Sequence, residues 1–70
     1  MDVLVFSTSV TVPEQVSKVN SLLAAVPAIR EWSFDLEDCD HILRVVSGDI
    51  SPRYIETLLL AAGFWCMELI

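Results

Sequence analysis

The sequence predicts an α+β fold: a ferredoxin-like βαββαβ sandwich in which a four-stranded antiparallel sheet carries two helices on one face. Two segments have apolar residues at the three- and four-residue spacing of an amphipathic helix. Four shorter runs are rich in strand-forming residues, and they alternate with the helical segments in the order βαββαβ. Two right-handed β-α-β crossovers in that order interleave most simply as one sheet with the first and third strands in its centre.

The first strand and the first helix come from the N-terminal part of the chain. The apolar run Val3–Phe6 is predicted to be a strand buried on both faces. Thr11 is expected to cap the helix, with Glu14 as its capping-box partner and Pro13 in the first turn. A single apolar stripe should follow, formed by Val12, Val16, Val19, Leu22, Leu23 and Val26. Pro27 ends this helix because proline cannot continue it.

The second and third strands are predicted to form a hairpin. From Ile29 to Leu36 the pattern has period two, with Trp32, Phe34 and Leu36 on one side and Glu31, Ser33 and Asp35 on the other. This is the pattern of a half-buried strand. The alternation stops at Glu37–Asp40 and resumes from His41 to Val46, so the acidic segment is the expected hairpin tip.

The second helix has an even clearer start. Ser51 is a typical N-cap, Pro52 suits the first helical position, and Gly63 supplies the residue with positive φ after the helix. Its apolar stripe is expected at Ile55, Leu58, Leu59 and Ala62. Phe64–Ile70 is then the last strand. In this topology the loop at Ser9–Thr11, the acidic hairpin tip and the turn at Gly63 share one end of the sheet, close to the first helix's N-terminus.

The bulk properties exclude several functions. We expect residues 1–70 to form a single domain, because 70 residues suffice for one, and their 54% hydrophobic content excludes disorder. The net charge of −6 argues against nucleic acid as a partner, since such binding depends on Lys and Arg. No apolar run is long enough to span a membrane. Two cysteines without a secretory signal indicate reduced thiols and a cytoplasmic location.

One stretch gathers most of the reactive side chains. Leu36–Ile42 contains Asp38, Cys39, Asp40 and His41, which are all groups that can bind a metal. Cys39 and His41 are nearly adjacent, however, without the two well-spaced ligand pairs of a structural zinc site. The simpler interpretation is a solvated acidic turn in which Cys39 is buried or half-buried. No pair of nucleophile and base can be argued either, so we expect no enzyme.

Two short motifs connect helices to strands: Val26-Pro27-Ala28-Ile29 after the first helix and Ala62-Gly63-Phe64 after the second. With these motifs the chain resembles the heavy-metal-associated domain family of copper chaperones and metal-transporting ATPase modules, over nearly its whole length. The family has Leu-Pro-Gly-Val and Leu-Gly-Tyr at the corresponding places, and Val16, Val19 and Leu23 fall where it has apolar helix positions.

The family's metal clamp is a Cys-x-x-Cys motif at the start of the first helix, which suits soft ions such as Cu(I). Counting back from Pro27, Val12 and Gln15 occupy the two cysteine positions. The resemblance therefore implies a fold member without the clamp, and we expect no metal at Val12 or Gln15 and no cofactor. The alternative is a displaced Zn or Cu site formed by Cys39, His41, Asp38 and Asp40.

The surplus of apolar strand residues favours a different function. Val3–Phe6 and Phe64–Ile70 are apolar at nearly every position, although the helices cover only one face of the sheet. The other face should then expose Val, Trp or Met, and exposed apolar patches usually mark interfaces. We expect a binding module that contacts a protein partner or forms a homodimer through this apolar sheet face.

Overall fold

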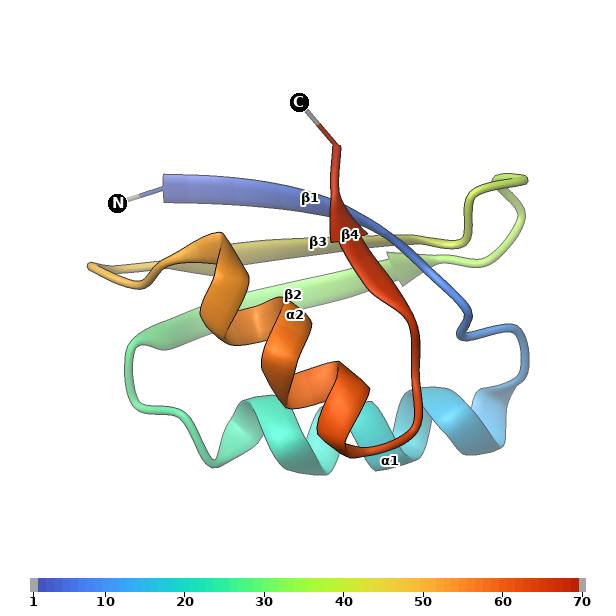
Figure 1. Ribbon diagram of the computed structural model, residues 1–70, viewed down its shortest axis with the longest axis horizontal. Coiled ribbons are helices and arrows are strands. Elements are labelled where there is room, and N and C mark those ends of the chain that lie inside the picture. The colour runs from blue at the N-terminus through green and yellow to red at the C-terminus, as the bar shows by residue number, and fades with distance from the viewer. Residues whose placement is uncertain (1, 70) are drawn as a thin grey trace.

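The computed structural model describes residues 2–69 and has the predicted order of elements (Figure 1). The strands and helices are β1 (Asp2–Thr8), α1 (Pro13–Ala24), β2 (Ile29–Asp35), β3 (Ile42–Ser47), α2 (Pro52–Ala61) and β4 (Cys66–Glu68). The sheet order is β2-β3-β1-β4, and every neighbouring pair is antiparallel. The first and third strands are therefore central, as predicted, and both helices lie on one face of the sheet (Figure 1).

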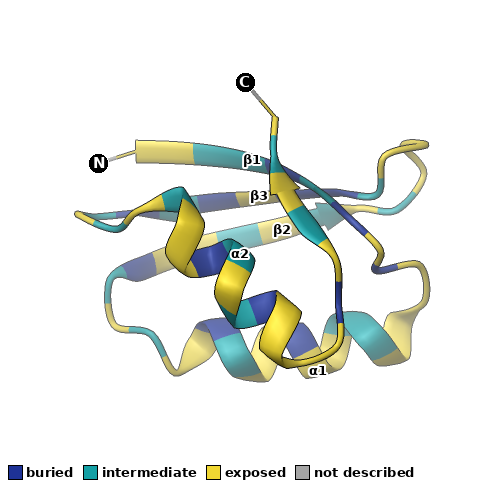
Figure 2. Ribbon diagram, in the orientation of Figure 1, coloured by how far each residue is buried: buried dark blue, intermediate teal, exposed yellow. Residues whose placement is uncertain are grey.

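The hydrophobic core lies between the sheet and the helices (Figure 2). Its buried members are Phe6, Val10, Val19, Leu23, Ile29, Leu43, Val45, Ile55, Leu59 and Phe64. Every element except β4 contributes to this set, while Cys66 from β4 packs against it as a half-buried residue. Alternate residues enter the core from the two central strands, Leu4 and Phe6 from β1 and Leu43 and Val45 from β3, as the period of the pleat requires.

The start of α1 differs from the prediction. The N-cap is Val12, which lies outside the apolar stripe and is 45% exposed. Gln15 replaces Glu14 as the capping side chain, because its Oε1 accepts hydrogen bonds from the backbone N–H of Thr11 at 2.8 Å and of Val12 at 3.4 Å. The Thr11 hydroxyl also donates to Gln15 Oε1, so Thr11 does not cap the helix itself. The stripe begins at Val16.

α2 follows the prediction closely. Ser51 is the N-cap, and its Oγ accepts a hydrogen bond from the backbone N–H of Arg53 at 3.1 Å. Gly63 has φ of 93°, the left-handed conformation that glycine adopts without strain. Only the last residue of the predicted stripe is wrong: Ala62 is exposed because the helix has ended at Ala61.

The first and last strands also need correction. β1 is longer than predicted and is buried on one face only, since Phe6 is fully buried whereas Val3 is 59% exposed. β4 is a three-residue strand, shorter than the predicted 64–70 run. Phe64 precedes it as a buried anchor, and Ile70 lies outside the described residues. The one-sided burial of β1 follows from the position of both helices on one face of the sheet.

Candidate functional site

Three connections meet at one end of the sheet, as the topology predicts. The hairpin between β2 and β3 joins the end of β1, where the backbone N–H of Thr8 donates to the carbonyl of Asp40 at 3.2 Å. The buried Thr8 hydroxyl donates to the carbonyl of His41 at 2.7 Å. On the other side, the N–H of Ser9 donates to the carbonyl of Trp65 at 3.0 Å. The first two hydrogen bonds fasten the hairpin to β1, and the third joins the residue after β1 to the segment that precedes β4.

The hairpin tip is organised by its own aspartates. Asp38 Oδ1 accepts a hydrogen bond from the N–H of Asp40 at 2.9 Å, and the carbonyl of Asp38 accepts one from the N–H of His41 at 3.0 Å. This is the Asx-turn geometry that aspartate favours. His41 has φ of 50°, so it belongs to the turn, and β3 begins one residue later than predicted.

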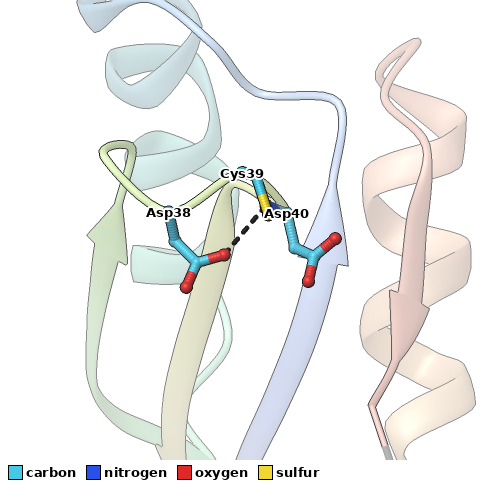
Figure 3. Close-up of side chains that lie close together, drawn as sticks. All are labelled: Asp38, Cys39 and Asp40. Atoms are coloured by element: carbon cyan, nitrogen blue, oxygen red, sulfur yellow. Dashed lines mark hydrogen bonds between the residues drawn. The ribbon is translucent and has the colours of Figure 1, made fainter.

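The turn gathers three of the four predicted ligands. One potential donor atom from each of Asp38, Cys39 and Asp40 lies within 4.8 Å of the other two. Figure 3 shows the two carboxylates on either side of the thiol. All three residues are exposed, which corrects the expectation that Cys39 is buried or half-buried. His41 is half-buried and is not part of this group. The predicted four-residue set is therefore reduced to a thiol and two carboxylates.

The two positions where the resemblance places cysteines carry other functions. Val12 is the exposed N-cap of α1, and Gln15 accepts the backbone hydrogen bonds that close the first turn. The two cysteines of the chain, Cys39 and Cys66, lie elsewhere and form no disulfide.

Cys66 is held apart from the hairpin. It is half-buried on β4, opposite Thr8 of β1, and burial together with the negative charge of Glu56 raises the pKa of its thiol from 9.0 to about 12. A thiol with such a pKa stays protonated at neutral pH, and the thiolate is the form that binds metals and attacks electrophiles. Cys66 is therefore unsuited to both roles.

The outer face of the sheet carries the predicted apolar surface. Met67 and Leu69 on or beside β4 are 53% and 43% exposed, and Val3 on β1 is 59% exposed. The half-buried Val5 lies next to Leu69, whose N–H donates to its carbonyl at 2.8 Å. We call Val3, Val5, Met67 and Leu69 the β1–β4 patch. Trp65, which is 49% exposed, lies at its border and also lines a hollow of about 290 Å³ against α2.

A second surface was missed by sequence reasoning. A groove of about 900 Å³ runs between α1 and β2, lined by Trp32, Phe34 and Leu36 from the strand side and by Val16, Ser17 and Asn20 among others from the helix. The period-two pattern identified the apolar side of β2 correctly. It gave no signal that α1 would leave that side half uncovered.

None of the helices in residues 2–69 is long and apolar enough to cross a membrane.

The fold is shared with several solved structures of metal-binding domains. The copper-binding domain of HMA7, a P-type ATPase, has a TM-score of 0.86 and 18% identity, with 100% of this chain and 96% of that domain covered. The N-terminal domain of PacS from Synechocystis PCC6803 has a TM-score of 0.85 and 13% identity, with both chains covered completely. The yeast copper transporter domain Ccc2a has a TM-score of 0.83 and 16% identity, covering 97% and 94%.

These neighbours are heavy-metal-associated and copper-chaperone domains, so the fold agrees with the resemblance seen in the sequence. No protein-family model matches the chain, and no curated protein sequence matches it.

Proposed function

We propose that this chain is a small, non-enzymatic binding module that contacts a protein partner, or a second copy of itself, through the β1–β4 patch. The observation that carries the proposal is the exposure of three adjoining apolar side chains, Val3, Met67 and Leu69, on the sheet face opposite to both helices. Exposed groups of this kind on a small domain usually belong to an interaction surface.

The energetics favour a weak but specific contact. Each of these side chains is about half exposed, so its complete burial would contribute roughly 1 kcal/mol. A patch of this size therefore suits a transient partner or a dimer that dissociates on dilution. One solved structure of the same fold is the Atx1–Cu(I)–Ccc2a complex, in which such a domain is bound to another protein.

Self-association is tested with the pure protein. Sedimentation velocity over a wide concentration range should show reversible dimerisation, and Leu69→Ser should shift it to higher concentration. Leu60→Ser is the matched control, because Leu60 is 67% exposed on α2, which lies on the face of the sheet opposite to the patch. Equal behaviour of the two variants would count against the patch.

A separate partner is tested by site-specific crosslinking in the cell. A photoreactive residue at position 67 should yield a defined adduct that the same residue at position 60 does not. A strict monomer in sedimentation, combined with no adduct specific to position 67, contradicts the proposal. The proposed compartment is the cytoplasm, which the two free thiols support.

A second candidate function rests on the hairpin group of Asp38, Cys39 and Asp40. Its donor atoms are close enough to share an ion. One thiolate with two carboxylates suits Zn(II) better than Cu(I), which prefers sulfur. Among the structures of this fold is the N-terminal domain of ZntA in its Zn(II) form.

Titration with Zn(II), and separately with Cu(I) under reducing conditions, decides this candidate. Saturable amide shifts at residues 38–41 that Cys39→Ser abolishes would support metal binding, and His41→Gln would show whether the imidazole joins the shell. A control variant, Cys66→Ser, should change nothing at the hairpin. Shifts that follow ionic strength alone would exclude a specific site.

A further inference from the structure

The edge of the sheet at β2 is open. Among residues 2–69, β2 pairs with β3 only, on one side. Its seven residues span a length that another strand could pair with. In antiparallel pairing, successive residues of a strand direct their N–H and C=O groups to opposite neighbouring strands. This alternation identifies the backbone groups of β2 that face the open side.

The alternation can be followed across the sheet from β4. Hydrogen bonds from the N–H of Ser9 to Trp65 and from the N–H of Leu69 to Val5 show that odd-numbered residues of β1 face β4. Phe6 therefore faces β3, and its partner Leu43 faces back toward β1.

The same alternation continues through β3 into β2. Arg44 faces β2 because its neighbour Leu43 faces β1, and Arg44 pairs with Ser33. Ser33 therefore bonds to β3, while Trp32 and Phe34 on either side direct their N–H and C=O groups to the open edge. Within the described residues no other hydrogen bond to these edge-facing groups is found.

The groove between α1 and β2 lies directly beside this edge. The side chains of Trp32 and Phe34 line the groove. In a strand paired at this edge, the residues opposite Trp32 and Phe34 would point their side chains to the same face, and so into the groove. No charged residue lines the groove. Its volume of about 900 Å³ admits several aliphatic side chains, and the residues that enter it should be apolar.

The opposite face of the same edge is acidic. The exposed charged residues of β2 are Arg30, Glu31 and Asp35, and the hairpin adds the exposed Glu37 and Asp38, so four carboxylates accompany one guanidinium group here. Arg44, which pairs with Ser33, is the exposed cation on this face of β3. The intervening residues of an added strand would lie beside these carboxylates, where Lys or Arg is favoured.

We propose that the open edge of β2 and the adjoining groove bind an extended peptide segment in which apolar residues alternate with Lys or Arg. Binding would add a fifth strand to the sheet, with main-chain hydrogen bonds to Trp32 and Phe34 supplying affinity and the two faces supplying selectivity. This site is separate from the β1–β4 patch, so it stands or fails independently of the function proposed above.

The test uses the full chain and short capped peptides. The probe alternates lysine with valine, and its controls alternate glutamate with valine or carry the same residues in blocks. In a Trp65→Phe background Trp32 is the sole tryptophan, so its fluorescence reports the groove directly. The alternating basic peptide should bind saturably, shift the amides of β2 and α1, and bind more weakly as salt is raised. Both control peptides should bind at least about tenfold more weakly.

Two further comparisons separate strand addition from simple charge attraction. N-methylation of one alternate set of peptide amides should abolish binding while methylation of the other set leaves it intact, because only one set faces the edge. Filling the groove with Ala24→Tyr should weaken binding about tenfold or more, since Ala24 lines it. The matched control is Ala61→Tyr, because Ala61 is likewise exposed and the last residue of its helix.

Three outcomes would overturn the proposal. The first is equal binding of the two methylated peptides. The second is amide shifts confined to the hairpin acids, which indicates charge attraction alone. The third is shifts centred on Met67 and Leu69, which would assign the peptide to the β1–β4 patch instead.

Discussion

The two edge strands of the sheet, β4 and β2, differ in length and in whether their outward-facing backbone groups have hydrogen-bond partners. β4 has three residues, and the N–H of Glu68, which faces away from β1, donates to the carboxylate of Glu56 on α2 at 2.8 Å. β2 has seven residues, and its edge-facing groups at Trp32 and Phe34 remain available beside a groove. An unprotected edge is a template for another strand.

The difference teaches that the domain protects one edge by covering it and the other by charge. Carboxylates beside β2 outnumber the exposed guanidinium groups of Arg30 and Arg44, so the net charge of this edge is negative and disfavours pairing with a second copy of itself. They attract a basic segment for the same reason. An edge with net negative charge disfavours pairing with itself and favours a partner of opposite charge.

The largest expected effect comes from releasing the anchor of β4. Phe64 is 7% exposed, and its N–H donates to the carbonyl of Leu59 at 2.9 Å. Phe64→Ala should lower the free energy of unfolding by about 3 kcal/mol through lost burial and a cavity. Urea denaturation measures the loss, and hydrogen exchange should show the β4 amides losing protection first.

The matched change on the other edge is Phe34→Ala. Phe34 is half-buried beside the groove, so this substitution should lower the free energy of unfolding by clearly less, about 1 kcal/mol. Equal losses for the two variants would mean that the edges are fastened alike.

The second prediction concerns alkaline pH and β4 alone. The pKa of Cys66 is raised from 9.0 to about 12 by burial and, secondarily, by Glu56. Above pH 9 the unfolded chain releases this proton while the folded chain retains it, so stability should fall progressively between pH 9 and about 12. Denaturation midpoints of wild type and Cys66→Ala measure the effect, which the substitution should remove. Cys39→Ala is the control, and a fall that disappears with it would point to the hairpin instead.

Much of this fold follows from local sequence signals. Ser51 and Gly63 bound α2 because capping and positive φ are properties of single residues and their neighbours. The start of α1 was misplaced because apolar spacing alone does not show where a stripe leaves the core: Val12 continues the period but is the exposed N-cap.

The functional surfaces depend on contacts between distant segments. Exposure of the β1–β4 patch could be predicted, since two helices cannot cover both faces of a sheet. The hydrogen bond between Glu68 and Glu56 and the groove beside β2 could not be predicted, because both depend on where each helix lies across the sheet. His41 was likewise assigned to a strand, and only the turn geometry separates it from the hairpin ligands.

The third prediction concerns the hydrogen bond from Glu68 on β4 to Glu56 on α2. Glu56→Ala leaves the N–H of Glu68 without its charged acceptor, so the free energy of unfolding should fall by about 1 kcal/mol. Glu56→Gln keeps an acceptor oxygen and should cost less. Glu56→Ala also leaves the outer edge of β4 open, so this variant should self-associate at concentrations where Glu56→Gln remains monomeric or dimeric to the same degree as the wild type. Sedimentation checks this, and no difference between the two would show that the length of β4, not the carboxylate, protects the edge.

The smallest effect is expected on the β2 side, where one hydrogen bond fixes the side chain that forms the groove. The indole N–H of Trp32 donates to Asn20 Oδ1 at 2.8 Å in an exposed position. Because water can replace this partner, Asn20→Ala should cost only about 0.5 kcal/mol. It should nevertheless free the indole, which the fluorescence anisotropy of Trp32 in a Trp65→Phe background would report. Ser17→Ala, at another groove position, is the control and should leave the anisotropy unchanged. A loss of stability as large as that of Glu56→Ala would mean that a side-chain hydrogen bond holds β2 to α1 as firmly as another holds β4 to α2. The two edges of the sheet would then not differ in the way described above.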